Sequence, residues 1–302
     1  MPVDSSPSRE YKKPPEGSLI KLFDPWKSPF CTCPLKYSLN PYTGCALRCH
    51  YCYITAYIPD AFRARPKVRL LSRVERDLAK IDLQLPIAIS NSTDPYQPLE
   101  RVRGDTGAVL RLIGSAGGKV IITTKSDLVL RDLDLLSSMR AAVMITITGL
   151  SAELSRKMEP GAPLPECRLR ALCELRGARV PVGVRLDPLI PGVNTDREGL
   201  LRLLDRLAEY SLHVTASTYK PRADNWKRMK AAFGDRLRDR DYSERVGRTR
   251  YLRRQMREEL LSWLKEEVEK RGMTYATCRE GLPELQSAGS CDGTHLIPLD
   301  KH

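Results

Sequence analysis

Short apolar runs alternate with segments of helical hydrophobic spacing through the middle of the chain. Apolar residues three or four positions apart predict amphipathic helices, and short continuous apolar runs are typical of buried strands. The predicted strands are 37–42, 86–90, 119–124, 142–148, 180–186 and 212–217. The predicted helices are 66–81, 106–116, 128–139, 166–176 and one that begins at a capping box of Thr195 and Glu198.

This alternation predicts a parallel α/β sheet whose strands are covered on both faces, because the runs are apolar throughout. Six βα units are too few to close an eight-stranded barrel, so a partial (β/α)6 TIM-type barrel fits best. A doubly wound open sheet is the alternative. We expect an extended N-terminal arm (1–30), the barrel (31–221) and a basic helical extension (222–302), with a long helix over 254–270, packed on the barrel.

The bulk properties of the 302 residues exclude several classes of protein. No run approaches the eighteen apolar residues that a membrane span requires. The Pro- and charge-rich first 26 residues lack the apolar core of a signal peptide. Nine cysteines without such a signal favour metal-binding or buried thiols in a reducing compartment over disulfides. We therefore expect a cytoplasmic protein.

The net charge of +13 is concentrated in residues 222–257, which carry thirteen Lys or Arg and five Asp or Glu, a net charge of +8. Basic residues interleaved with Trp226, Phe233, Tyr242 and Tyr251 predict a nucleic-acid contact surface. The alternatives are a solvated helix face or the ion-pair-rich surface of a thermophile.

Polar residues follow the predicted strands, at the edge where chemistry is found in βα barrels. Lys125, Arg185 and Lys220 stand out, because a cation at a barrel mouth requires an anionic partner. Thr148 and Ser217 can equally be turn formers or helix caps. The strand-end segments are 91–94, 123–126, 148–149, 185–188 and 217–220.

Cys45, Cys49 and Cys52 place three thiols within eight residues of a loop that follows a predicted strand. Four Cys normally hold a [4Fe-4S] cluster, so a cluster held by three has one iron free for a small-molecule ligand. A structural zinc site is the first alternative, with His50 as a conceivable fourth ligand. Three unrelated buried cysteines are the second alternative.

The C-x3-C-x2-C spacing, with an aromatic residue before the third Cys, resembles the signature of the radical SAM superfamily, and the resemblance covers roughly residues 37–220. Within that superfamily the chain is similar to the spore photoproduct lyase-like ("DNA repair photolyase"-like) branch. The motifs that carry this narrower resemblance are residues 40–45 (Asn-Pro-Tyr-Thr-Gly-Cys), 93–98 (Thr-Asp-Pro-Tyr-Gln-Pro), 159–160 (Glu-Pro) and 187–192 (Asp-Pro-Leu-Ile-Pro-Gly).

The resemblance implies a reduced [4Fe-4S] cluster that splits S-adenosylmethionine into methionine and a 5′-deoxyadenosyl radical, which abstracts a hydrogen atom from a substrate. It also implies an electron donor such as ferredoxin or flavodoxin. By position, Tyr51 is expected near the adenine, Thr93 and Asp94 near the methionyl ammonium, and Lys125 or Arg185 at its carboxylate. Thr148 is a further candidate cofactor residue, and the candidate catalytic residues are Tyr96, Lys125, Arg185 and Tyr219.

One departure from the branch concerns the hydrogen donor. Spore photoproduct lyases return a hydrogen atom from a Cys, but the segment after the second strand reads Ser90-Asn91-Ser92-Thr93, and no Cys occurs between Cys52 and Cys167. Thymine-dimer repair by that route is therefore not expected. Tyr96 is a substitute donor, unless the reaction regenerates no radical.

The remaining thiols fall into two sets. Cys31, Cys33, Cys278 and Cys291 predict a second, four-cysteine site for zinc or an auxiliary iron–sulfur cluster, which would tie the C-terminal segment to the barrel entry. Alternatively these segments never meet, or Cys278 or Cys291 lines the active site as a hydrogen donor. Cys167 and Cys173, six residues apart in a predicted helix, are interpreted as packing residues.

Three functional hypotheses follow. The first is a radical SAM enzyme, a lyase or transferase, acting on a nucleic acid in DNA repair or in RNA or DNA modification. The second keeps this chemistry but takes a protein, peptide or small metabolite. The third is a zinc-binding nucleic-acid adaptor without catalysis.

Overall fold

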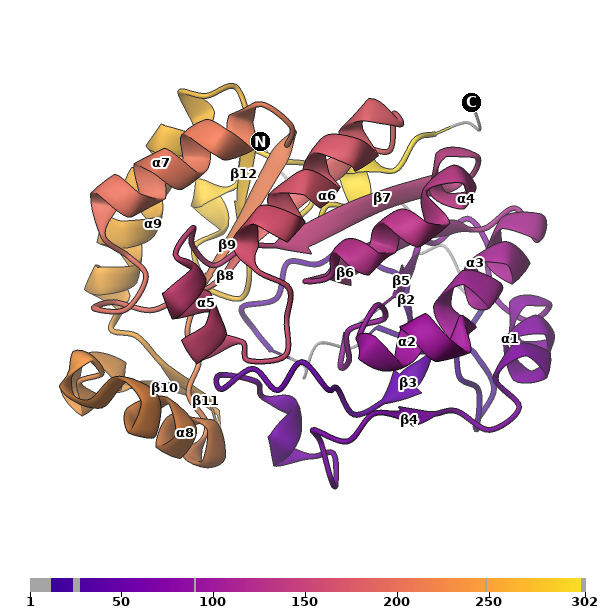
Figure 1. Cartoon of the computed structure of the whole chain (residues 1–302), viewed down its shortest axis with the longest axis horizontal. Coiled ribbons are helices and arrows are strands. Elements are labelled where there is room, and N and C mark those ends of the chain that lie inside the picture. The colour runs from indigo at the N-terminus through magenta and orange to yellow at the C-terminus, as the bar shows by residue number, and fades with distance from the viewer. Residues whose placement is uncertain (1–11, 24–27, 90, 248, 300–302) are drawn as a thin grey trace.

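The computed structural model describes residues 12–23, 28–89, 91–247 and 249–299, so parts of the expected N-terminal arm and Ser90 lie outside the described residues. Its centre is an eight-stranded sheet (Figure 1). The strands, in their order across the sheet, are β1 (Lys21–Leu22), β2 (Tyr37–Leu39), β5 (Ile87–Ile89), β6 (Lys119–Thr124), β7 (Arg140–Thr146), β8 (Val182–Leu189), β9 (His213–Thr218) and β12 (Thr274–Thr277).

The strands from β2 to β12 run parallel, and only β1 pairs antiparallel to its neighbour. All six predicted strands are present, and the partial barrel is confirmed. β12 is a seventh parallel strand that the sequence did not reveal, and it lies within the segment 222–302 that was assigned to an extension. Two small antiparallel hairpins, β3 (Tyr42–Thr43) with β4 (Arg65–Pro66) and β10 (Glu244–Val246) with β11 (Thr249–Tyr251), lie apart from the main sheet.

Helices alternate with the strands and cover the convex face of the sheet (Figure 1). Three of them, α2, α5 and α8, are not individually predicted by the sequence pattern, and the predicted helix 128–139 is a 3₁₀ segment followed by α4. The helices are α1 (Leu70–Leu78), α2 (Pro98–Arg103), α3 (Asp105–Ser115), α4 (Leu133–Ser137), α5 (Ala152–Met158), α6 (Pro165–Gly177), α7 (Arg197–Ala208), α8 (Ala223–Phe233) and α9 (Arg254–Glu269).

Three element ends differ from the prediction. Asp196, not Thr195, caps α7, because its carboxylate accepts a hydrogen bond from the Gly199 amide at 2.6 Å. The helix predicted over 66–81 begins only at Leu70, after Arg69 in the left-handed region (φ 51°). β8 continues to Leu189, so the 187–188 pair lies inside the strand and not after it.

The two faces of the sheet differ in what they bury. The large core lies between the sheet and the helices and contains side chains such as Val120, Val143 and Leu172. On the opposite face, Ala142 and Met144 pack against Ile297 near the C-terminus. This inner face is otherwise rich in polar side chains near the carboxyl ends of the strands. In the described part of the chain, no helix has the length and apolar character to span a bilayer.

Candidate active site

The loop of Cys45, Cys49 and Cys52, here called the cluster loop, follows the β2 and β3 strands at the carboxyl edge of the parallel sheet. Gly44 begins it in the left-handed region, at φ 75°. A Cβ atom at Gly44 would lie 2.2 Å from the Arg63 carbonyl oxygen, so only glycine fits this turn. The Cys45 amide donates to the Ala61 carbonyl at 2.8 Å and fixes the start of the loop.

Side-chain and backbone contacts from three other elements hold the cluster loop. Gln97, which is fully buried, accepts from the Ala46 amide at 2.8 Å and donates to the Gly44 carbonyl at 3.1 Å. The backbone at Gly161 lies so close that a Cβ atom there would be 2.4 Å from the Ala46 carbonyl oxygen. The His50 amide donates to the Met158 carbonyl at 2.9 Å. The loop is therefore preorganised by the protein.

The three thiols lie near one another in a buried setting. Burial raises the pKa of Cys49, and the charges of Cys52 and Cys45 raise it further. Burial likewise raises the pKa of Cys45 and of Cys52. Among the described residues, no three His, Cys, Asp or Glu side chains are gathered closely enough to share one metal ion. The thiolates of a [4Fe-4S] cube bind separate irons, so three buried thiols in one loop fit such a cluster.

Lys125 meets the cluster loop as expected. Its ammonium lies 5.6 Å from the centroid of the Tyr51 ring. Burial alone would lower the pKa of Lys125, but the nearby Cys49, Glu159 and Asp94 raise it above its ordinary value. The cation can therefore balance the negative charge of an anionic cluster or of a cofactor carboxylate.

Glu159 is the site residue that strand-order reasoning missed, although the Glu159–Pro160 motif had drawn attention to it. It is fully buried and forms an ion pair with Arg168 at 2.5 Å. The Tyr51 hydroxyl donates to Glu159, and the Thr148 hydroxyl lies 3.5 Å from the same oxygen. Burial would raise the pKa of Glu159, but Arg168 and Lys125 hold it below its ordinary value. This carboxylate anchors the Tyr51 end of the cluster loop.

Asp94 lies on the same side of the site. Its carboxylate accepts from the Thr124 hydroxyl at 2.6 Å and from the Lys125 amide at 2.8 Å. Burial raises the pKa of Asp94 despite these bonds. The adjacent Thr93 is also buried, with 5 % of its surface exposed. The structure thus brings together Tyr51, Asp94 and Lys125, three of the predicted cofactor residues.

Arg185 and Asp187 form a second charged group on β8. Their side chains are 2.7 Å apart. Burial would lower the pKa of Arg185, but the Cys278 thiol and Asp187 raise it well above its ordinary value. Burial would raise the pKa of Asp187, but Arg185 and Lys220 lower it. Arg185 therefore faces Cys278 and Asp187.

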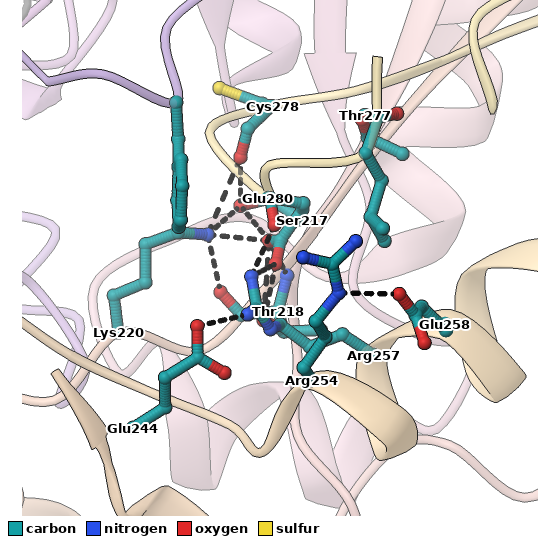
Figure 2. A network of polar contacts seen from close by, with 12 residues as sticks. Ser217, Thr218, Lys220, Glu244, Arg254, Arg257, Glu258, Thr277, Cys278 and Glu280 are labelled. Carbon is teal, nitrogen blue, oxygen red and sulfur yellow. Dashed lines mark hydrogen bonds and ion pairs between the residues drawn. The ribbon is translucent and has the colours of Figure 1, made fainter. Parts of the chain in front are cut away.

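Lys220 is held by the C-terminal segment (Figure 2). Its ammonium is 2.5 Å from the buried Glu280 and 2.7 Å from the Ser217 hydroxyl. Figure 2 shows the Cys278 carbonyl oxygen facing Lys220 while its sulfur points away. The anionic partner expected for Lys220 is thus an internal carboxylate.

Two predicted catalytic tyrosines have structural partners instead. The Tyr96 hydroxyl donates to Asp132 at 3.0 Å, and its ring belongs to the core between the sheet and the helices. This position does not favour Tyr96 as a hydrogen donor. The Tyr219 hydroxyl donates to Asn225 at 2.7 Å, and Asn225 in turn donates to the Tyr51 carbonyl at 3.0 Å. Tyr219 therefore connects α8 to the cluster loop.

The four remaining predicted thiol ligands, Cys31, Cys33, Cys278 and Cys291, are here called the second thiol group, and two of them are in contact. The sulfurs of Cys33 and Cys291 are 3.4 Å apart. Hydrogen bonds from Cys291 and Cys31 lower the pKa of Cys33 to about 2, with a contribution from Lys36. The charge of Cys278 acts on both Cys31 and Cys291, so its thiol lies nearby. Of the two thiols interpreted as packing residues, Cys173 is exposed and Cys167 is half-buried.

Six of the thirteen basic residues of segment 222–257 are ion-paired with nearby carboxylates. Its aromatic side chains Phe233, Tyr242 and Tyr251 are buried, so they present no stacking surface. Six of its arginines lie within ion-pair distance of carboxylates: Arg228 with Asp224, Arg238 and Arg253 with Asp241, Arg250 with Asp239, Arg254 with Glu258, and Arg257 with Glu244. The ion-pair-rich surface considered from the sequence describes this segment well.

A three-thiol loop at the carboxyl edge of a partial βα barrel defines a class of cysteine-ligated iron–sulfur enzymes. The comparison with protein families agrees: the Radical SAM superfamily matches residues 39–204. The chain belongs to this superfamily, whose members use a [4Fe-4S] cluster and S-adenosylmethionine and require a reductant.

Several known proteins are similar to this chain. An uncharacterised protein of Mycobacterium tuberculosis is 27% identical over 217 residues, 61% of each chain. A radical SAM Nα-GlyT isomerase of Pseudomonas phage M6 is 23% identical over 286 residues, 87% of this chain and 58% of that protein. The chain therefore spans less than two thirds of the length of these relatives.

Solved structures show the same fold at low identity. A spore photoproduct lyase variant with dinucleoside spore photoproduct superposes with a TM-score of 0.63 at 19% identity, covering 80% of this chain and 75% of that one. Streptococcus suis SuiB bound to its precursor peptide SuiA gives a TM-score of 0.55 at 14% identity, covering 80% of this chain and 48% of that one. These similarities support the spore photoproduct lyase-like fold that the motifs predicted.

Proposed function

We propose that this protein cleaves S-adenosylmethionine reductively and abstracts a hydrogen atom from a nucleic-acid substrate. The observation that carries the proposal is the meeting of the buried three-thiol loop with Lys125 and Glu159 at the carboxyl edge of the sheet. When bound, the cluster and S-adenosylmethionine supply the 5′-deoxyadenosyl radical, and the protein supplies orientation and exclusion of water.

Different residues of the site would have separate roles in this chemistry. Cys45, Cys49 and Cys52 would hold three irons of the cluster. Lys125 would balance the charge of the methionyl carboxylate, and Asp94, already bonded by two donors, would orient the Lys125 backbone. Glu159 holds the Tyr51 hydroxyl and so fixes the ring beside the cluster loop. Thr93 and Thr148 lie beside these groups and would complete the cofactor site.

The net charge of the chain and its structural similarity to spore photoproduct lyase support a nucleic-acid substrate. A net charge of +13 favours polyanions, and the spore photoproduct lyase structure of the same fold holds a dinucleoside. A peptide substrate is the second candidate, because the arginines of the basic segment are ion-paired and SuiB of the same fold holds a peptide.

One anaerobic experiment tests the chemistry. Purified protein, reconstituted with iron and sulfide and reduced with dithionite, should contain about four irons and release 5′-deoxyadenosine from S-adenosylmethionine. Deuterated oligonucleotides and peptides then identify the substrate by label carried into 5′-deoxyadenosine. A colourless zinc protein that releases none would instead support the zinc-binding adaptor.

A double variant tests the nucleic-acid surface. R253A/R254A should weaken oligonucleotide binding and lower the salt slope of log K by about one per lost phosphate contact. The matched control is R202A, an exposed arginine of α7 that also pairs with a carboxylate. Unchanged binding in the double variant removes the nucleic-acid reading of this segment and favours the peptide.

The second metal site also stays a proposal. Thiols are ligands suited to a soft metal, but among the described residues no three of these side chains lie closely enough to share one ion. Metal analysis of a C45A/C49A/C52A variant tests it. Retained zinc or iron that is lost on adding C33S and C291S would establish the site, and metal-free protein would exclude it.

A cytoplasmic location is likewise a prediction.

A further inference from the structure

A cationic recess lies beside the cluster loop. It has a volume of about 380 Å³ and is lined by Arg48, His50, Phe62, Pro160, Gly161 and Arg228. None of these residues belongs to the charged groups around Lys125 and Arg185. The recess therefore borders the cluster loop on a side that the predicted cofactor residues do not line.

The floor of the recess is the backbone that joins two of the cluster cysteines. Arg228 on α8 donates to the His50 carbonyl at 3.2 Å and to the Cys52 carbonyl at 3.1 Å. The Nδ1 atom of His50 is buried without a hydrogen-bond partner in this structure. Two of the residues that line the recess, Arg48 and His50, are the chain neighbours of Cys49.

The walls of the recess are positively charged. The Arg48 and Arg228 guanidinium groups lie over the Phe62 ring, at 5.9 and 5.3 Å from its centroid, where cation–π contact holds them. In the described part of the chain, no carboxylate lines the recess. Asp224, which pairs with Arg228 at 3.1 Å, offsets only one of the two cations.

We propose that this recess is the docking surface of an acidic one-electron donor protein that reduces the cluster, an inference that rests on the proposed function. The reductant that the superfamily requires must approach the cluster closely, because electron transfer falls steeply with distance. One electron passes from the reduced donor to the oxidised cluster, and no bond forms or breaks. The exposed Arg48 and the half-buried Arg228 give the charge complementarity that steers such an encounter.

The charge-reversed variant R48E tests the proposal, because Arg48 is an exposed residue of the cluster loop whose side chain carries one of the two positive charges of the recess. R111E is the matched control: Arg111 is exposed on α3, on the side of the molecule away from α8 (Figure 1). Reduced flavodoxin is the protein donor, and dithionite is the small-molecule donor. The readouts are bleaching of the cluster absorbance after rapid mixing and binding of oxidised flavodoxin to the cluster-free protein.

In R48E, the rate of cluster reduction by flavodoxin, relative to that by dithionite, should fall about tenfold at low salt, with weaker flavodoxin binding and a smaller salt dependence. R111E should retain the ratio of the unmodified protein. Equal ratios in R48E and R111E overturn the proposal, as does loss of oligonucleotide binding in R48E with flavodoxin binding intact. If dithionite itself bleaches no cluster in the unmodified protein, the proposed function fails first, and flavodoxin binding still reports on the recess.

Discussion

The two thiol groups of this protein reach their positions in opposite ways. The cluster loop takes its three thiols from eight consecutive residues, and other elements only hold the loop in place. The second thiol group takes four thiols from three segments, with Cys33 and Cys291 separated by 258 positions but in sulfur contact at 3.4 Å. The first is a local motif placed by the fold, and the second exists only because the chain folds.

The electrostatic settings differ as well. In the cluster loop, burial keeps the pKa of all three thiols high until a metal cluster displaces their protons. In the second group, neighbouring thiols and Lys36 favour a thiolate at Cys33 without any metal. Lys36 is itself buried and pairs with Asp292 at 2.5 Å. The surroundings of the cluster loop therefore disfavour a thiolate at every position, whereas those of the second thiol group favour one at Cys33.

The largest expected effect comes from removing a cluster thiol. C45A, C49A or C52A should each reduce 5′-deoxyadenosine formation to background, because a cluster held by two thiolates is not retained. Iron content and product release are measured on anaerobically reconstituted protein. C173A, which changes an exposed thiol of α6, is the matched control. Full cleavage activity in any of the three variants would show that the thiols of the cluster loop are not needed for the chemistry, and would remove the functional distinction between the cluster loop and the second thiol group.

The second largest effect concerns the support of the cluster loop. E159Q removes the charge that balances the buried Arg168, and breaking such a pair costs about 3–5 kcal/mol of unfolding free energy. Because the pKa of Glu159 is held below its ordinary value of 4.5, the ionised carboxylate stabilises the fold above that pH and ceases to do so as the pH falls through the lowered pKa.

The difference in stability between unmodified protein and E159Q should therefore shrink in acid, as measured by denaturant unfolding across pH. E153Q, on an exposed residue of the neighbouring α5, is the control and should change stability by less than about 0.5 kcal/mol. A pH-independent difference would show that the Glu159 charge contributes nothing.

Sequence reasoning succeeded where a local pattern determines the structure. The run 119–124 is β6 to the residue, and the cluster loop lies at the carboxyl edge of the sheet as the spacing and strand order required. Sequence reasoning failed where pairing with a neighbouring strand determines whether a segment becomes a strand. Thr274–Thr277 is a short run without a distinctive period, and it becomes a strand only through its parallel pairing with β9.

The site residues follow the same division. Strand order predicted that Lys125 and Asp94 lie at the carboxyl edge, because Lys125 follows β6 directly and Asp94 lies in the connection after β5. It could not show that the Tyr96 hydroxyl turns toward Asp132 and the helices, since that depends on side-chain packing. Glu159 lies in the connection after α5, and its partner Arg168 lies on the next helix, so only the folded chain reveals the pair.

A third prediction sharpens the electrostatic contrast. At about pH 6, well below the ordinary thiol pKa of 9.0, iodoacetamide should label Cys33 in the cluster-free protein, because only a thiolate reacts. C33S should remove this low-pH labelling from the second thiol group, as measured by peptide mass spectrometry. Exposed Cys173 provides the reference for accessibility. Labelling of Cys33 only in alkali would show that the group holds no thiolate.

The smallest expected effect comes from the buried cation. Cys291 and Cys31 are the main causes of the lowered pKa of Cys33, and Lys36 contributes less. K36M should therefore move the pH midpoint of Cys33 labelling upward by only about one pH unit, whereas the sulfur partners C31S and C291S should move it further. K21M, on an exposed residue of β1, is the matched control and should leave the midpoint unchanged. A larger shift in K36M than in C291S would show that Lys36 contributes more than Cys291 to the lowered pKa of Cys33. The Cys33 thiolate would then be stabilised mainly by a lysine and not by a network of thiols that share protons.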